Sequence, residues 1–287
     1  MIVTVNHISS FFEKWAPQST KLDFDNVGLL VGDPNASISG IITCLDVTDA
    51  VVEEAISAGA NLITAHHPPI FRKISRINPI TEQGRLLYKL IKHDIGVFVA
   101  HTNLDMAFEG VSFALAEMLG LRNLGFLKGE VSKVTGETIG LGAVGAVENP
   151  EGMPVDGFLA MVARNMGLSN FRYSGSADRI KQVAVCGGTG ASLVSEVQRQ
   201  DIQAYITADV KYHEYFVEKD NLLLVDIGHY ESEIPIVEVL RERIAQEFTS
   251  LKVASTRVNT NPMRYFSTSH HGEHIQTQNP KSTNVQA

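Results

Sequence analysis

The feature that most constrains the fold is a regular alternation of short apolar runs and helical segments between Gly40 and Gly120. The runs GIITCL, NLITA and IGVFVA are short and rich in β-branched residues, which is typical of buried strands. The segment TDAVVEEAISAG between the first two has helical apolar spacing, with Thr48 placed to cap its start and Gly59 to end it. Strands that alternate with helices pair mostly in parallel through right-handed crossovers, so the sequence predicts an α/β fold.

A second stretch, from Lys181 to Gln246, has the same layout. The run ANLITAHH corresponds to QAYITADV, and HDIGVFVAHTNLD corresponds to KDNLLLVDIGHYESE. We therefore expect two related α/β lobes whose strand ends face one shared cleft. The expected units are a first lobe at 1–126, a β-α-β connector at 127–180, a second half at 181–266 and a polar, disordered tail at 267–287.

Side chains that bind metals follow several of these strands. The candidate ligands are His66, His67, Asp105, His229 and Glu233. Imidazoles and carboxylates together suit Zn²⁺, Mn²⁺, Fe²⁺, Co²⁺ or Ni²⁺, and this set is too rich in nitrogen for Ca²⁺ or Mg²⁺. The set is too large for one tetrahedral zinc, whereas two ions roughly 3.5–4 Å apart need about this many ligands. The sequence therefore predicts two divalent metal ions in the cleft, with Glu233 as the carboxylate that contacts both.

Each candidate ligand also has a structural explanation. The adjacent His66 and His67 precede two prolines and would suit an ordinary strand-to-loop turn, in which neighbouring rings point to opposite sides. Asp105 lies at the start of a helical segment and would serve as an N-cap. Glu233 lies close to the first turn of a helix that includes Pro235, and a carboxylate there suits the positive end of the helix dipole. The combination of these residues at strand ends favours the metal site.

His101 directly follows a predicted strand. It is the candidate catalytic residue, which would move protons beside the metal, and a hydrogen-bonded histidine at a strand end is the alternative. His213, in the corresponding loop of the second half, is a weaker candidate of the same kind. The other histidines are expected at the surface or in the tail and are given no role: His7, His93, His270, His271 and His274.

The glycine-rich segment CGGTGAS lies between a predicted strand and a helix, where backbone amides can hold a phosphate. It lacks the lysine of a P-loop and the spacing of a dinucleotide fingerprint, so a tight strand-to-helix turn is the favoured role of Gly187, Gly188 and Gly190. Cys44 and Cys186 lie far apart and are expected to be buried free thiols.

The net charge and the apolar runs argue against some partners. A net charge of −8, from 24 Lys and Arg against 32 Asp and Glu, provides no general attraction to nucleic acid or anionic membranes. The first residues, MIVTVNHISSFFEKWA, lack the basic and apolar regions of a signal peptide. The longest uncharged apolar run, from Ile139 to Val147, is far shorter than the ~20 residues that span a bilayer. We therefore expect a cytoplasmic protein.

Six ordered motifs between about Asn6 and Phe266 resemble the NIF-three-like proteins, often labelled GTP cyclohydrolase type-two homologues: FDNVGLLVGD, ITAHHPPIF, AHTNLD, CGGTGAS, ITADVKYHE and DIGHYESE. The resemblance implies two interlocked α/β lobes and a dinuclear metal centre in the cleft between them, held by the five ligands named above. It also implies a homohexameric ring with the metal sites facing an internal cavity. Phe24 stands where the family usually has Trp, and the domain that longer relatives insert between the halves is missing.

These observations predict a metal-dependent hydrolase that acts on a nucleotide-like or phosphate-bearing substrate, with a metal-activated water as the nucleophile. A metal-handling or metal-delivery protein is an alternative in which the same ligands store or transfer an ion. A ring that holds nucleic-acid strands in its cavity is a further alternative, which the net charge does not support. No residue pattern marks a guanine pocket.

Overall fold

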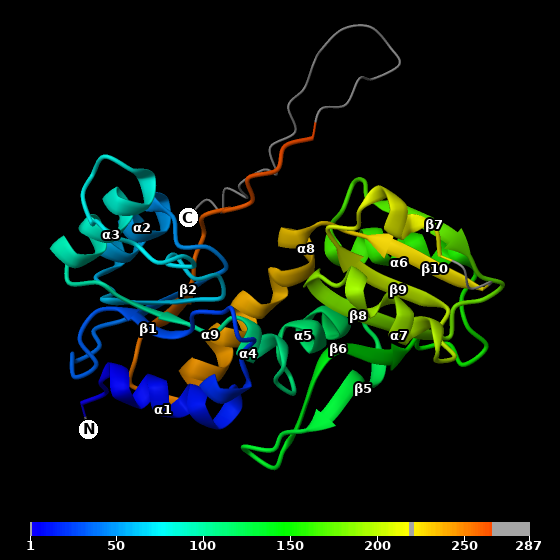
Figure 1. Cartoon of the computed structure of the whole chain (residues 1–287), viewed down its shortest axis with the longest axis horizontal. Coiled ribbons are helices and arrows are strands. Elements are labelled where there is room, and N and C mark those ends of the chain that lie inside the picture. The colour runs from blue at the N-terminus through cyan, green and yellow to red at the C-terminus, as the bar shows by residue number, and fades with distance from the viewer. Residues whose placement is uncertain (1, 218–220, 266–287) are drawn as a thin grey trace, which may run out of the picture.

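The computed structural model describes residues 2–217 and 221–265, so the tail predicted at 267–287 lies outside the described residues. Within these residues, two β-sheets are each packed against helices (Figure 1). The first sheet has five strands in the order β1-β4-β3-β2-β11, and the second has six in the order β5-β6-β8-β9-β10-β7. The predicted α/β fold class is confirmed.

The chain first forms α1 (Val5–Trp15), η1 (Gln18–Thr20), β1 (Gly28–Val31), β2 (Ile41–Cys44), α2 (Asp49–Ala58), β3 (Leu62–Ala65), α3 (Glu82–Lys92), β4 (Gly96–Val99), α4 (Thr102–Asp105) and α5 (Val111–Met118). It continues with β5 (Arg122–Val131), β6 (Thr138–Ala146), α6 (Val155–Met166), β7 (Arg172–Ser176), β8 (Gln182–Thr189), η2 (Ala191–Leu193), α7 (Val194–Gln198), β9 (Ala204–Ala208), η3 (Tyr212–Tyr215) and β10 (Leu222–Asp226). The last elements are α8 (His229–Glu233), α9 (Pro235–Glu247) and β11 (Val253–Ser255). None of the described helices is long and apolar enough to cross a membrane.

Four strands of each sheet share one arrangement. Strands β2, β3 and β4 run parallel, and β1 is antiparallel to β4. In the second sheet β8, β9 and β10 run parallel, and β7 is antiparallel to β10. The two sheets therefore have the same core topology, which agrees with the repeat seen in the sequence. They differ in their added strands, because β11 extends the first sheet beside β2 and the β5-β6 hairpin extends the second beside β8.

Helices cover both faces of the first sheet. Phe98 of β4 packs against Phe12 of α1 with ring centroids 4.8 Å apart, and Leu240 of α9 joins the same cluster. On the opposite face Ile63 of β3 packs in a cluster with Val51 of α2. Because side chains alternate along a strand, each apolar strand contributes to both cores, as a buried parallel sheet requires.

The ends of helix α2 follow the local sequence. The hydroxyl of Thr48 accepts a hydrogen bond from the N–H of Val51 at 3.3 Å, which caps the first turn. Gly59 ends the helix in the left-handed conformation, with φ of 67°, which glycine adopts without steric cost. Both predicted caps are confirmed.

The second sheet includes most of the middle of the chain. Strands β6 and β7, which lie in the segment predicted as a connector, both belong to this sheet. Phe158 of α6 packs with Ile206 of β9 on one face, and Tyr205 of β9 packs with Val197 on the other. Cys44 and Cys186 are buried and free, as predicted.

The helical segment predicted around Asp105 is divided into α4 and α5. Asp105 ends the short helix α4 and does not cap a longer one. The break lies at Gly110, where a Cβ atom would be only 1.9 Å from the carbonyl oxygen of Leu104, so only glycine allows this close approach. Helix α4 thus places Asp105 one turn after His101, just past the end of β4.

Candidate metal centre

Four histidine rings from different strand ends gather at one place. His66 and His67 directly follow β3, His101 lies between β4 and α4, and His229 begins α8 after β10. The ring of His67 is 4.9 Å from that of His66, 5.6 Å from that of His101 and 5.5 Å from that of His229, measured between centroids. Parallel strands bring their carboxyl ends to one edge of a sheet, and here the edges of both sheets contribute.

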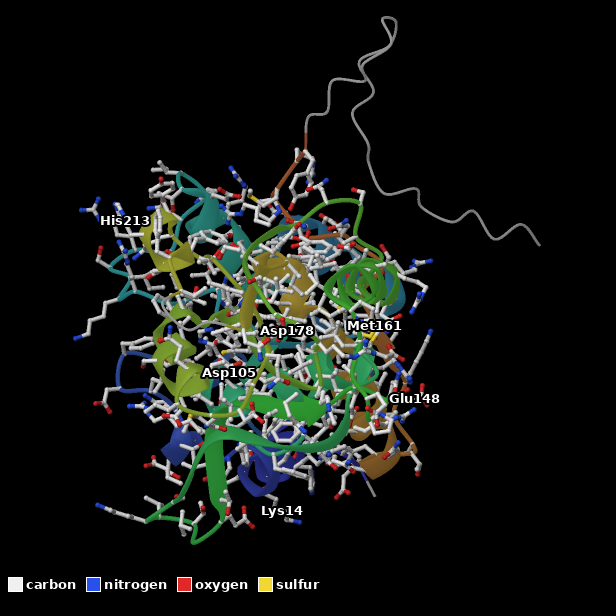
Figure 2. The ribbon with its side chains drawn as sticks, turned by 90° about the vertical axis from the view of Figure 1, so that its right-hand side faces the viewer. Lys14, Asp105, Glu148, Met161, Asp178 and His213 are labelled. Atoms are coloured by element: carbon white, nitrogen blue, oxygen red, sulfur yellow. The ribbon has the colours of Figure 1, made fainter. Side chains whose placement is uncertain are left out.

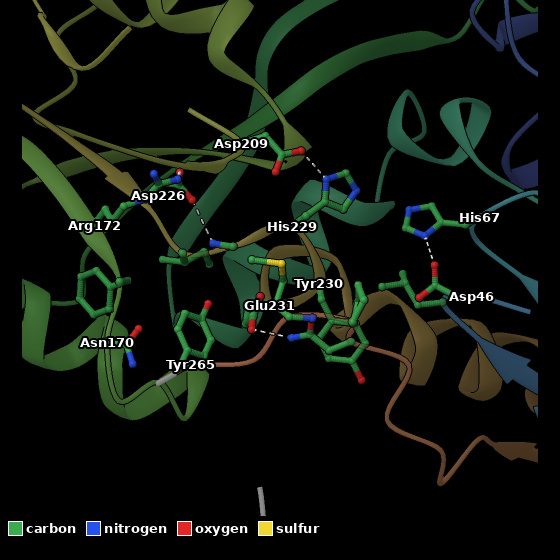
Figure 3. A pocket seen from close by; sticks show the side chains of 17 residues that line it. Asp46, His67, Asn170, Arg172, Asp209, Asp226, His229, Tyr230, Glu231 and Tyr265 are labelled. Atoms are coloured by element: carbon green, nitrogen blue, oxygen red, sulfur yellow. Dashed lines mark hydrogen bonds and ion pairs between the residues drawn. The ribbon is translucent and has the colours of Figure 1, made fainter. Parts of the chain in front are cut away.

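Each of these rings uses Nδ1 for a hydrogen bond to an oxygen behind it. The partners are Ala100 O for His66 (2.9 Å), Asp46 Oδ1 for His67 (2.8 Å), Asp25 Oδ1 for His101 (2.8 Å) and Asp209 Oδ2 for His229 (2.7 Å). In a neutral imidazole, an Nδ1–H that donates to an oxygen fixes the tautomer and leaves the lone pair on Nε2. The rings are therefore oriented as metal ligands usually are, and Figure 3 shows two of these pairs.

The Glu233 carboxylate lies among the Nε2 atoms. Its Oε2 is 2.9 Å from Nε2 of His67 and 3.1 Å from Nε2 of His229, and its Oε1 is 3.8 Å from Nε2 of His66. Asp105 Oδ1 is also 3.8 Å from Nε2 of His66. Three buried side-chain atoms of the described residues lack a hydrogen-bond partner: Oγ1 of Thr64, Nε2 of His66 and Oε2 of Glu233. Buried polar atoms rarely lack a partner, and the last two belong to residues that face each other, so they favour a cation site.

The charged groups of the centre stabilise one another, which favours protonated histidines beside an ionised Glu233. Burial would lower the pKa of His67, but Asp46 and Glu233 outweigh it and raise that pKa to about 10. Contact with Glu233 raises the pKa of His229 to about 9 against the effect of burial. Burial opposes ionisation of Glu233, yet contacts with the histidines hold its pKa well below the usual value. Burial also raises the pKa of Asp105 to about 6.

Two groups of side chains could each hold an ion. One consists of His66, His67 and His101, the other of His67, His229 and Glu233, and within each group the ligand atoms all lie within 4.8 Å of one another. The structure thus brings all five predicted ligands together. It also places the ring of His101 within ligand range of two of them, so His101 directly adjoins the centre.

Sequence reasoning missed the carboxylates behind the rings: Asp25, Asp46 and Asp209. Asp46 and Asp209 come shortly after the ends of β2 and β9, and the candidate ligands also follow strand ends. This position in the sequence could have identified the two carboxylates. Each is held by a threonine hydroxyl as well, at 2.7 Å for both Thr260 to Asp46 and Thr189 to Asp209. By contrast, His213 is exposed on η3 at the edge of the molecule, away from Asp105 (Figure 2).

The family model of Duf34/NIF3 (NGG1p interacting factor 3) matches residues 3–262. The chain belongs to this family. A Clostridium perfringens protein described as a GTP cyclohydrolase 1 type 2 homolog is 37% identical over 248 residues, which cover 86% of this chain and 93% of that protein. A Clostridium acetobutylicum protein of the same description is 35% identical over 247 residues, covering 85% and 90%. The resemblance found in the motifs is confirmed.

Solved structures of Duf34/NIF3 type share the fold. A crystal structure of a Staphylococcus aureus protein superimposes with a TM-score of 0.84 at 27% identity, covering 92% of this chain and 99% of that one. A Halalkalibacterium halodurans relative aligns over 365 residues, more than the 287 of this chain, at 27% identity and with 90% and 98% coverage. That relative therefore has residues that this chain lacks.

The glycine-rich segment of this Duf34/NIF3 chain lies directly against the metal centre. A Cβ atom at Gly188 would be 2.2 Å from Oε1 of Glu233, and the residue has a φ of 62°. Its N–H donates to Oγ of Ser232 at 2.9 Å, which ties the end of β8 to helix α8. Gly187 and Gly188 lie within β8, and only Gly190 stands at the junction with η2, so the predicted strand-to-helix turn is limited to Gly190. The structure adds a reason for glycine, because only a residue without Cβ leaves room for the Glu233 carboxylate.

Proposed function

We propose that this Duf34/NIF3 protein is a metal-dependent hydrolase with a dinuclear centre. The observation that carries the proposal is the position of Glu233, whose Oε1 faces His66 and whose Oε2 faces His67 and His229. Ligand atoms about 2 Å from a shared ion lie roughly 3–3.5 Å from one another. The separations of 2.9–3.8 Å around Glu233 are of this size, which supports a carboxylate that bridges two neighbouring ions.

The residues present fit such a pair of ions. His66 and Asp105 would complete the first site with Glu233, and His67 and His229 would complete the second. Imidazole nitrogens with carboxylate oxygens suit Zn²⁺, Mn²⁺, Fe²⁺, Co²⁺ or Ni²⁺. When bound, two such ions supply Lewis acidity and lower the pKa of water toward ~7. The hydrogen bonds that each Nδ1–H donates keep the lone pair of Nε2 available for binding.

His101 is assigned to proton transfer. Burial opposes ionisation of Asp25, but hydrogen bonds from His101 and Thr102 hold the pKa of this carboxyl well below its usual range. The ionised Asp25 accepts from Nδ1 of His101 and so orients the ring, whose centroid is 5.1 Å from that of His66. With Nδ1–H engaged, Nε2 of His101 can accept a proton from a reacting group beside the centre.

The proposed substrate is nucleotide-like or phosphate-bearing, because bound divalent ions would attract phosphate oxygens and two relatives are described as GTP cyclohydrolase homologues. A homohexameric ring is proposed on the family resemblance.

The test begins with elemental analysis of untagged protein, which excludes metal held by an affinity tag. The metal found is then used in a screen of hydrolase substrates with wild type, His67→Ala and Glu117→Gln. Glu117 is exposed on α5 and serves as the matched control. We expect close to two ions per chain and turnover that is lost in His67→Ala and kept in Glu117→Gln. Equal turnover in wild type and His67→Ala, at reduced metal content, would contradict the proposal.

A further inference from the structure

A cavity of 510 Å³ extends from the metal centre along the second sheet (Figure 3). His67 and His229 line its inner end, and Asn170, Arg172 and Tyr265 line it farther out. Cavities of about 300–1,000 Å³ hold small organic ligands. A ligand in this cavity would therefore reach the two histidines with one end while its remainder lies away from the proposed ions.

The C-terminal segment forms one side of this cavity. Asn261, Met263 and Tyr265 line it, although they follow β11 of the first sheet. The segment is anchored on both sides, because Thr260 donates to Asp46 at 2.7 Å and Nδ2 of Asn261 donates to Glu231 Oε1 at 2.8 Å. The cavity is thus a built site in which segments from both sheets meet.

The fixed charges of the cavity are mostly negative. Its carboxylates are Asp46, Asp209, Asp226 and Glu231, and its cation apart from the histidines is Arg172. The Arg172 guanidinium forms an ion pair with Asp226, so it is engaged within the protein. An anionic group in the outer part of the cavity would therefore meet carboxylates without a free counter-charge.

Glu231 differs from the other carboxylates. Asp46 and Asp209 each accept from a histidine Nδ1 and a threonine hydroxyl. Glu231 accepts from Asn261 through Oε1 alone, and its Oε2 has no hydrogen-bond partner in the described part of the chain. This oxygen is available to accept a hydrogen bond from a ligand.

Aromatic and apolar side chains provide the rest of the surface. Phe171, Tyr230, Met263 and Tyr265 line the cavity together with the carboxylates. Flat apolar surface favours a planar ring, and a free carboxylate oxygen favours N–H donors on that ring. Building on the proposed hydrolase, we propose that the cavity binds the part of the substrate that is a planar, non-anionic ring with N–H donors, and that Glu231 recognises those donors.

The test uses the full-length, metal-loaded protein and two neutral, inert probes of the same size, benzamide with N–H donors and acetophenone without them. Calorimetry should show that benzamide binds at least about tenfold more tightly, and that Glu231→Gln weakens benzamide binding by about 10- to 100-fold with little effect on acetophenone. Tyr265→Ala should weaken both probes, because it removes ring surface. Glu117→Gln, outside the cavity, should leave both affinities unchanged.

Equal affinity for the two probes, or an unchanged benzamide affinity in Glu231→Gln, would overturn the inference. Elemental analysis and circular dichroism of each variant confirm that the metal and the fold are retained. Probe binding needs no turnover. A protein that binds benzamide as expected but hydrolyses nothing would therefore contradict the proposed function and leave the recognition by Glu231 standing.

Discussion

Glu233→Gln should lower the metal content of both proposed sites while the fold survives. The Glu233 side chain is almost fully buried, and its two oxygens face three histidine Nε2 atoms at 2.9, 3.1 and 3.8 Å. Glutamine has nearly the same volume, but it has no charge and only one acceptor oxygen. It therefore cannot offset the repulsion between two dications or bind both of them.

The magnitude follows from the position of Glu233. Loss of an outer-shell partner of a metal ligand commonly lowers metal affinity about 10- to 100-fold. Glu233 would contact both ions directly, so we expect at least such a loss at each site. His66→Ala should weaken mainly one ion. Nε2 of His66 faces Asp105 Oδ1 and Glu233 Oε1, whereas His67 contacts two other oxygens, Asp46 Oδ1 and Glu233 Oε2.

The assay is the metal-to-chain ratio, measured by elemental analysis after dialysis against a weak chelator. Glu231→Gln is a matched control, since it makes the same change two residues away on α8 and should keep both ions. Circular dichroism reports on folding. If Glu233→Gln retains two tightly held ions and His66→Ala retains none, Glu233 is not the bridging ligand and the reasoning is refuted.

Four further outcomes are expected. Asp46→Asn should weaken metal binding about 10- to 100-fold, because the amide holds the histidine ring less firmly; titration with the metal checks this. Gly188→Ala should reduce metal content, because its Cβ would lie 2.2 Å from a Glu233 oxygen, whereas Gly125→Ala, with nothing within 4 Å, should not; elemental analysis compares the two. Truncation after Phe266 should leave circular dichroism and metal content unchanged, and loss of metal would show that the tail binds it. Light scattering should report a particle well above 31.4 kDa, and a monomer at micromolar concentration would contradict the ring.

The fold class, and the convergence of the candidate ligands, could be predicted from the sequence because both depend on local patterns. Alternating strand and helix periodicity predicts parallel pairing, and parallel pairing brings strand ends to one edge. His66, Asp105 and Glu233 follow strand ends, so their convergence was expected from topology alone. The weak repeat between the halves also has a counterpart in the matching strand orders β1-β4-β3-β2 and β7-β10-β9-β8.

Tertiary structure alone decided how the ligands are held and what lies beside them. Asp25 supports His101 from 76 positions away, and no local period links the two. The close approach of Gly188 to Glu233 depends on how β8 packs against α8, and the cavity is completed by Asn261 after the chain has returned to the first sheet. Contacts between distant segments depend on how whole elements pack, whereas periodicity reports only which face of each element is buried. Sequence patterns therefore predicted which residues meet, and packing determined their orientation and their neighbours.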